Sequence, residues 1–368
     1  MSASASEQPG TENAARDEAN PSRGQQSVSS SQAAPPKNDT FPHPHVIPTA
    51  PGASARTYQT TIRVLNKLFL PAFKIWVAGE KIDDAIKETK KLNARHPKAT
   101  AIINFLGEHY TQDWKVLRTV NEYMRAIGRI SDSRVRASIS LKPSQMGFDL
   151  PENGPSTAER NMTAIVEAAA KRGIFAWIDM EHTGYTDFTV VTYREWLRTM
   201  SNVGIVLQAN LKRTMADLRT LCTLDRGEYP NPAKIRLCKG IYKEPPEVSF
   251  TQKPDVNRNF GELIEYLISE APQDVWAAVA SHDDVYTDLG IKLNAARPHA
   301  FFEVQMLRGV RPELQTELME RDIQLAVYTP YGEDSLPYSF RRATRANNLT
   351  ATVIRSLLSG IYKKVYQK

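Results

Sequence analysis

Short apolar runs recur eight times along this chain, and a stretch with helical periodicity follows each one. The runs are Ala101–Leu106, Ala137–Leu141, Ile174–Ile178, Gly204–Leu207, Lys234–Leu237, Val275–Ala280, Ala300–Val304 and Gln324–Val327. Apolar runs of this length are typical of parallel strands that are buried on both faces. Eight such strands alternating with eight helices predict an α/β fold, a closed (β/α)8 TIM-like barrel.

Polar residues stand at or just past the end of every run. They are Glu108, Lys142, Asp179, Gln208, Arg236 with Lys239, His282, Gln305 and Tyr328. In barrels of this kind the chemistry takes place at the carboxyl ends of the strands. The pattern therefore indicates an enzyme. The long, Pro-containing connection Tyr242–Arg258 is expected to act as a lid.

The expected helices complete the alternation. After the eight runs they are Gln112–Ile127, Pro155–Lys171, Tyr193–Asn202, Met215–Thr223, Asn257–Ser269, Val285–Leu293, Pro312–Glu320 and Tyr338–Tyr362. Before the first run, residues 56–98 are predicted to form a helical arm with helices Tyr58–Val77 and Lys81–Asn93. Residues 1–55 are rich in Ser, Ala, Pro, Gln and Asn and predict a disordered tail, which leaves 99–368 for the barrel.

Net charge, cysteine spacing and the N-terminal residues indicate which partners, metals and cell compartments to expect. The formal net charge is +6, but Lys and Arg are spread along the chain without a basic run, so nucleic acid is not expected as a partner. Cys222 and Cys238 lack metal-binding spacing, so no metal is expected and both are interpreted as buried free thiols. Met1–Gln8 lacks the features of a secretory signal, which favours a cytoplasmic location. The apolar stretch Leu65–Ala78 within the arm is expected to pack on the barrel as a helix or, as an alternative, to rest on a membrane surface.

The sequence Tyr338-Ser339-Phe340-Arg341-Arg342 is the sharpest local signal. On a helix, Tyr338, Arg341 and Arg342 occupy positions i, i+3 and i+4 and share one face. Two guanidinium groups and a phenol on one face suit a carboxylate or a phosphate, and each charge-assisted hydrogen bond contributes about 1.5–3 kcal/mol. A solvated basic face is the alternative.

Four more motifs, in this order and spacing, give the chain a resemblance to a known family. They are Ser140-Leu141-Lys142-Pro143-Ser144, Arg236-Leu237-Cys238-Lys239-Gly240, Phe302-Glu303-Val304-Gln305-Met306-Leu307 and Tyr328-Thr329-Pro330-Tyr331-Gly332. With the arginine pair, they make residues 57–360 resemble the proline dehydrogenases. The resemblance implies FAD-dependent oxidation of L-proline to 1-pyrroline-5-carboxylate, by hydride transfer from C5 to flavin N5. It also implies a quinone acceptor, and with it a peripheral contact at the inner membrane face.

The resemblance also assigns roles to residues. The implied catalytic residues are Lys142, Asp179, Arg236 and Tyr328. The implied substrate-binding residues are Lys142, Leu307, Tyr328, Tyr338, Arg341 and Arg342. The implied cofactor-binding residues are Gln208, Arg236, Lys239, Gly240 and His282. The chemistry suits these roles, because three cations fix one carboxylate, Asp179 offsets part of their charge, and Arg236 favours a reduced flavin.

Each assignment has an alternative. Lys142 could bond a neighbouring carboxylate, and Asp179 could cap the segment after it. Gln208 could bond the barrel backbone, and His282 could be a loop histidine. Structural roles are expected first for Glu108, Glu181 and Glu303.

Three positions depart from the family pattern. Arg345 stands where glutamate is expected, Ile241 replaces a common alanine, and Asn210 replaces a common tyrosine. A ring-substituted or more acidic proline, oxidised in a biosynthetic pathway, is therefore an alternative substrate. A non-catalytic barrel that binds an amino acid is the alternative of a different class.

Overall fold

The computed structural model describes residues 75–335 and 338–339. The predicted tail, the predicted helix Tyr58–Val77 apart from its last residues, and most of the predicted helix Tyr338–Tyr362 lie outside the described residues. The same holds for Arg341, Arg342 and Arg345. The division of the chain into tail, arm and barrel therefore stays a prediction.

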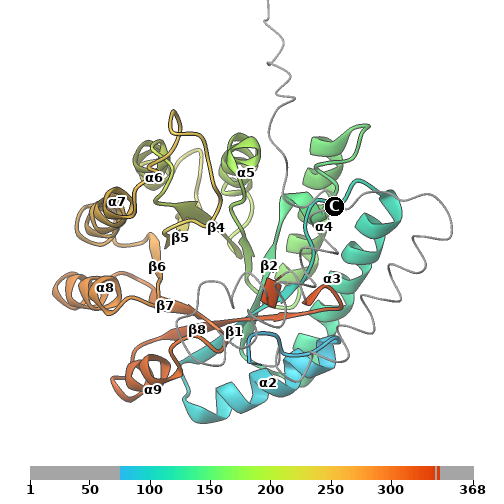
Figure 1. Ribbon diagram of the computed structural model, residues 1–368, viewed down its shortest axis with the longest axis horizontal. Coiled ribbons are helices and arrows are strands. Elements are labelled where there is room, and N and C mark those ends of the chain that lie inside the picture. The colour runs from blue at the N-terminus through green and yellow to red at the C-terminus, as the bar shows by residue number, and fades with distance from the viewer. Residues whose placement is uncertain (1–74, 336–337, 340–368) are drawn as a thin grey trace, which may run out of the picture. The chain divides into compact units, whose positions relative to one another are not determined.

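Eight parallel strands close into a barrel in the order in which they follow one another along the chain (Figure 1). They are β1 (Ala99–Phe105), β2 (Ala137–Leu141), β3 (Ala176–Ile178), β4 (Val203–Gln208), β5 (Lys234–Cys238), β6 (Trp276–Ala280), β7 (Phe302–Leu307) and β8 (Leu325–Tyr331). Each contains most of one predicted run, so the predicted barrel is confirmed. The barrel closes through the pairing of β1 with β8.

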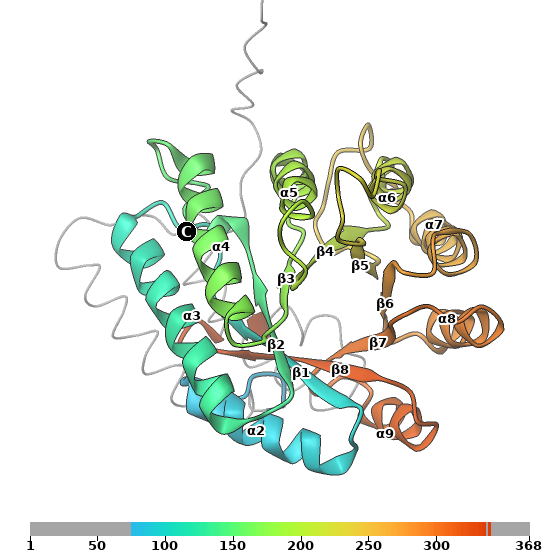
Figure 2. The same cartoon turned by 180° about the vertical axis from the view of Figure 1, so that it is seen from behind.

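Helices follow the first seven strands and surround the barrel (Figures 1 and 2). They are α3 (Asp113–Ser133), α4 (Gly154–Ala170), α5 (Thr183–Trp196), α6 (Thr214–Cys222), α7 (Lys253–Glu265), α8 (Asp284–Ala296) and α9 (Pro312–Glu320). The predicted helix Tyr193–Asn202 was wrong in its bounds, because α5 begins ten residues earlier, at Thr183. The β-branched residues of this segment disfavour a helix intrinsically, but burial of Tyr185, Thr189 and Tyr193 against the barrel outweighs that preference.

The helix before the barrel, α2 (Ile82–Arg95), packs on the outside of β1 and β8 and beside α3. Its Ile82, Ala85 and Ile86 are buried in the main hydrophobic core. It corresponds to the predicted arm helix Lys81–Asn93. This helix covers the outer surface where the barrel closes (Figure 1).

The barrel interior is filled by side chains from alternating strand positions. Ile102, Trp177, Ala278 and Ala326 form a separate buried cluster inside the ring of strands. Gly204 on β4 makes room for the Trp177 ring, because a Cβ at this position would lie 2.6 Å from the indole. The guanidinium of Arg236 lies against the Trp177 ring.

Two further findings concern the described part of the chain. Cys222 is buried, Cys238 is half-buried, and both are free thiols. None of the helices within residues 75–335 is both long enough and apolar enough to cross a bilayer.

Candidate active site

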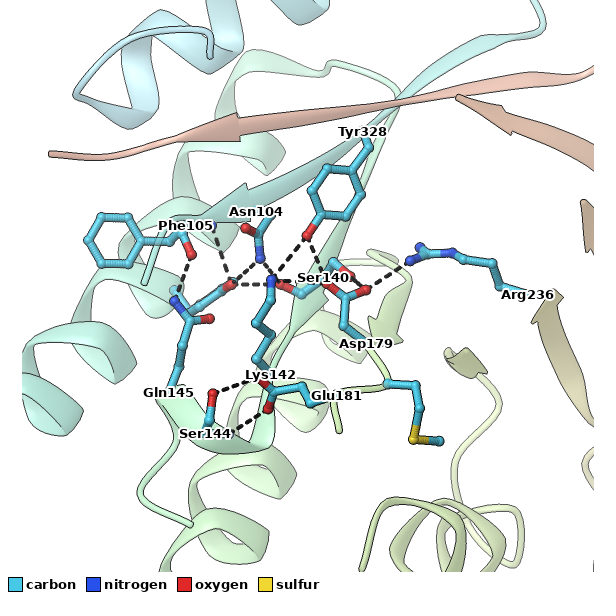
Figure 3. A network of polar contacts seen from close by, with 12 residues as sticks. Asn104, Phe105, Ser140, Lys142, Ser144, Gln145, Asp179, Glu181, Arg236 and Tyr328 are labelled. Carbon is cyan, nitrogen blue, oxygen red and sulfur yellow. Dashed lines mark hydrogen bonds and ion pairs between the residues drawn. The ribbon is translucent and has the colours of Figure 1, made fainter. Parts of the chain in front are cut away.

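Four side chains predicted to be catalytic meet at the carboxyl end of the barrel (Figure 3). Lys142 follows β2 and Asp179 follows β3, while Arg236 lies in β5 and Tyr328 in β8. The backbone N–H of Asp179 donates to the carbonyl of Leu141 at 2.8 Å, which continues the pairing of β2 with β3 past the end of the strand. The barrel therefore brings together residues that are far apart in the sequence.

Asp179 is the centre of this group. Its Oδ1 accepts from Ser140 Oγ at 2.5 Å and from Arg236 Nη1 at 2.8 Å. Its Oδ2 accepts from Tyr328 Oη at 2.7 Å and from Lys142 Nζ at 3.2 Å. Lys142 Nζ also donates to Tyr328 Oη at 3.3 Å. We call these five residues, Ser140, Lys142, Asp179, Arg236 and Tyr328, the Asp179 network.

Burial and neighbouring charges shift the pKa values of Asp179 and Lys142 in opposite directions. Burial alone would raise the pKa of Asp179, but the charges of Lys142 and Arg236, with hydrogen bonds from Ser140 and Tyr328, hold that pKa below its ordinary value. Burial alone would lower the pKa of Lys142, but the Asp179 and Glu108 carboxylates raise it. Burial and the Asp179 carboxylate raise the pKa of Tyr328. The Asp179 network therefore consists of two cations, one carboxylate, a neutral phenol and the Ser140 hydroxyl.

Within the described residues, Arg236 makes a hydrogen bond with only one of its three side-chain nitrogens. Its side chain is only 6% exposed, and its guanidinium lies 4.6 Å from the centroid of the Trp177 ring. Nη1 bonds Asp179, but Nε and Nη2 have no hydrogen-bond partner among the described residues. Buried donors without a partner are rare in folded proteins, and they suit a ligand with acceptor atoms at this level of the barrel.

The ends of β4 and β5 form a second part of the site. Gln208 donates from Nε2 to the backbone carbonyls of Met180 at 3.0 Å and Glu181 at 2.8 Å, so its amide does bond the barrel backbone. Gly240 has φ +90°, and a Cβ there would collide with Asn210 and lie 2.8 Å from Gln208 Oε1. Only glycine lets the backbone lie this close to both amide side chains.

Lys239 and His282, both predicted to bind the cofactor, have protein partners near the mouth of the barrel. Lys239 Nζ pairs with Asp283 at 2.9 Å and lies 4.2 Å from the centroid of the Tyr286 ring. His282 Nε2 accepts the backbone N–H of Leu307 at 2.8 Å. This bond fixes the imidazole beside the end of β7.

The structure describes only some of the substrate-binding residues that the resemblance implies. Leu307 and Tyr328 are paired neighbours on β7 and β8, so their side chains lie on the same face of the sheet. Tyr338 is buried. Arg341 and Arg342 lie outside the described residues, and their roles stay predictions.

Three neighbours of the site were not among the predicted site residues. Ser140 lies on β2, two positions before Lys142, which directly follows the strand, and alternation along an extended chain places both side chains on the inner face. That spacing was the signal that could have found it. Asn104 and Tyr123 also support β2, since Asn104 Nδ2 and Tyr123 Oη donate to the carbonyl of Ser140 at 3.0 and 2.6 Å.

Asp179 and Glu181 differ in role although they are two residues apart. Asp179 bonds the network and does not cap α5, a role that falls to the imidazole of His182. Glu181 accepts from the N–H of Ser144 at 2.9 Å and from its Oγ at 2.7 Å, as the predicted structural role requires. Burial and the neighbouring Glu108 carboxylate raise the pKa of Glu181 to about 7.

The raised pKa of Glu181 predicts how stability depends on pH. Between the ordinary pKa of 4.5 and about 7, the folded protein holds a proton at Glu181 that the unfolded chain releases. The free energy of unfolding should therefore fall as pH rises through this window, and Glu181→Gln should make the fall less steep. Urea unfolding at a series of pH values measures this. A control is Glu122→Gln on α3, and equal slopes in wild type and Glu181→Gln would contradict the prediction.

The residues present fit a flavin. The Nε and Nη2 atoms of Arg236, which have no partner in the part of the chain that the structure describes, are donors of the kind that the acceptor atoms of a flavin ring need. Because Gly240 has no side chain, its backbone lies uncovered beside Gln208 and Asn210. Asn210 Oδ1 is a buried acceptor without a partner among the described residues. Donors, an acceptor and an open backbone position thus lie together along β4 and β5.

Fold and site together define a β/α-barrel protein with a buried charge network at the catalytic end of the strands. The model of the proline dehydrogenase family matches residues 85–350. Proline dehydrogenase 1 of Bacillus subtilis is 33% identical over 285 residues, which is 77% of this chain and 89% of the relative. Proline dehydrogenase of Deinococcus radiodurans is 30% identical over 295 residues, with coverages of 77% and 89%. The chain belongs to the proline dehydrogenase family.

Solved structures support the fold. Proline utilization A (PutA) from Bdellovibrio bacteriovorus matches with a TM-score of 0.67 and 22% identity, over 77% of this chain and 34% of that one. PutA from Bradyrhizobium japonicum matches with a TM-score of 0.63 and 20% identity, over 82% of this chain and 34% of that one. The chain thus spans about a third of the length of these PutA chains.

Proposed function

We propose that this protein is an FAD-dependent enzyme that oxidises L-proline to 1-pyrroline-5-carboxylate and passes the electrons to a quinone. The observation that supports this proposal best is the Asp179 network, in which two cations share one buried carboxylate at the catalytic end of the barrel. Membership of the proline dehydrogenase family supports the substrate and the reaction.

The substrate's carboxylate is the group that the cations would bind. Lys142 keeps its positive charge at neutral pH, because the Asp179 and Glu108 carboxylates outweigh its burial. We place Arg341 and Arg342 with Lys142 as the anion clamp, and Tyr338 beside them. Leu307 and Tyr328 would form the wall against the pyrrolidine ring, which excludes water from the reacting carbon.

Arg236, Gln208, Lys239, Gly240 and His282 would hold the FAD. Acceptance of the hydride from the substrate's C5 at flavin N5 is the chemistry that bound FAD would supply. Arg236 supplies a fixed positive charge where negative charge develops, and Asp179 and Trp177 hold its guanidinium in place before the reaction. Tyr328 stays protonated and donates to Asp179, so it adds no charge to the site.

A steady-state assay tests this function. Purified protein, L-proline and a water-soluble quinone should yield reduced quinone and the cyclic imine product in equal amounts. Omission of either reactant should abolish turnover. A colourless protein, without flavin absorbance, would instead support a non-catalytic barrel that binds an amino acid.

A lipid-soluble quinone as the physiological acceptor would bring the protein to a membrane surface. Co-sedimentation of the protein with quinone-containing vesicles measures that contact.

A substituted proline is the second candidate substrate, and the departures from the family pattern are the reason to test it. Asn210, which replaces a common tyrosine, places its buried Oδ1 over Gly240 without a hydrogen-bond partner among the described residues. Arg345 and Ile241 are the other departures from the family pattern. We expect kcat/KM for a hydroxylated or a more acidic proline to exceed that for L-proline if this candidate is right. A clear preference for L-proline eliminates it.

A further inference from the structure

A buried carboxylate that the proposed function does not use lies deeper in the barrel. Glu303 on β7 is only 5% exposed and accepts a hydrogen bond from the amide of Gln305. Its neighbour Val304 belongs to the core outside the barrel, packed with α9 residues such as Leu314 and Leu318. Because side chains alternate along a strand, Glu303 points into the barrel.

Strand register places Glu303 two strands away from Arg236 in one row of the sheet. The strand register pairs Arg236 with Ala278, and Ala278 with Glu303, so the three residues form one row across β5, β6 and β7. Ala278 belongs to the interior cluster with Trp177 and is too short to separate the two longer side chains. The Nε and Nη2 donors of Arg236 are those left without a partner among the described residues.

The surroundings of Glu303 bring the pKa of its carboxyl group close to neutral pH. Burial raises the pKa of Glu303 to about 7, although the Gln305 hydrogen bond and the Arg236 charge oppose this shift. Burial also lowers the pKa of Lys234, one row below Arg236, to about 8. Among ionisable groups, Arg236 acts on the charge of Glu303 directly. Lys234 lies on the same strand as Arg236, and Asp179 and Tyr328 are linked to Arg236 through the Asp179 network.

We propose that Glu303 is a positioning residue that sets, through Arg236, how strongly the protein favours the reduced cofactor. Deprotonated Glu303 offsets the positive charge of Arg236 and makes reduction harder. Protonated Glu303 leaves that charge available and makes reduction easier. The inference rests on the proposed function, since it needs a flavin above Arg236.

The proton balance of reduction follows from this role. With Glu303 protonated throughout, reduction to the anionic form takes up two electrons and one proton. With Glu303 deprotonated beforehand, the added negative charge raises the proton affinity of its carboxylate, and reduction takes up two electrons and two protons. The second proton forms the O–H bond of the Glu303 carboxyl and comes from solvent. The pH dependence of the potential should therefore be steeper near neutral pH than in more acidic solution.

The test is the midpoint potential of the purified holoprotein as a function of pH, with dithionite as reductant and flavin absorbance as readout. Wild type and Glu303→Gln should coincide at about pH 5.5, where Glu303 is protonated. Above neutral pH the variant should have the higher potential. The equilibrium should favour its reduced form about tenfold more, or about 30 mV for a two-electron couple. Glu303→Gln keeps the shape and the Gln305 hydrogen bond, so it should fold.

Two controls make the test specific. Glu122→Gln removes a carboxylate outside the barrel and should reproduce the wild-type curve. Glu303→Asp keeps an ionisable group and should keep the change of slope. Parallel curves for wild type and Glu303→Gln, or the same separation in Glu122→Gln, overturn the inference while leaving the proposed function intact. A protein that binds no flavin overturns both.

The infrared difference spectrum between oxidised and reduced protein gives an independent readout. At neutral pH, reduction of wild type should produce a protonated-carboxyl band, and Glu303→Gln should lack it. The same band in both proteins overturns the inference.

Discussion

Replacing Asp179 with alanine is expected to lower kcat/KM for L-proline by about a hundredfold to a thousandfold, the largest effect of any single change in the barrel interior. The carboxylate is the common partner of Lys142, Arg236, Ser140 and Tyr328. Without it, two buried cations lose their counter-charge and their fixed positions. Breaking a buried ion pair in this way also destabilises a protein by about 3–5 kcal/mol. Steady-state kinetics and urea unfolding measure the two effects.

The Asp179→Asn variant separates charge from shape. The amide keeps the size of the carboxyl group but carries no charge, so we expect kcat/KM between those of wild type and Asp179→Ala. Asp149→Ala is a control, because Asp149 pairs with His109 and Tyr185 apart from the network. The interpretation of Asp179 is contradicted if Asp179→Ala retains kcat/KM within about threefold of wild type, an effect of well under 1 kcal/mol.

The second large effect is expected from Gly240→Ala, which should weaken FAD binding by at least about tenfold, or about 1.4 kcal/mol. Gly240 has φ +90°, a conformation that other residues rarely adopt, and a Cβ there would collide with Asn210. Either the backbone or the amide side chains must move, and both lie where we place the flavin. Reconstitution of flavin-free protein with FAD, followed by fluorescence, measures the dissociation constant.

Gly173→Ala is the matched control for Gly240→Ala. Gly173 also has a positive φ, +65°, but a Cβ there would meet nothing within 4 Å. It should therefore lose a little stability from backbone strain and keep the wild-type affinity for FAD. Equal affinities in Gly240→Ala and wild type would remove Gly240 from the cofactor site.

The sequence predicted the barrel well because its signals are local. Buried parallel strands are short apolar runs, and the strand at Ala137–Leu141 agrees with its predicted bounds. The start of α5 was missed because the packing of its β-branched residues against the barrel outweighs their local preference, which only the folded structure reveals.

The site was predictable only in part. Strand-end positions were enough to bring Lys142, Asp179 and Tyr328 together, because all parallel strands of a barrel end at the same rim. The partners of each side chain depend on register between distant segments. That is why the bonds of Gln208 to the backbone of Met180 and Glu181 stood only as an alternative. The pairing of Lys239 with Asp283 was likewise not predicted.

We propose that this end of the barrel binds a flavin, which takes up electrons from proline. An anaerobic titration of the purified holoprotein with L-proline, followed at flavin wavelengths, tests that claim most directly. We predict that the visible flavin absorbance is bleached in proportion to the L-proline added and returns when a quinone is mixed in. An unchanged flavin spectrum at saturating L-proline, in a protein that dithionite does bleach, would contradict the claim.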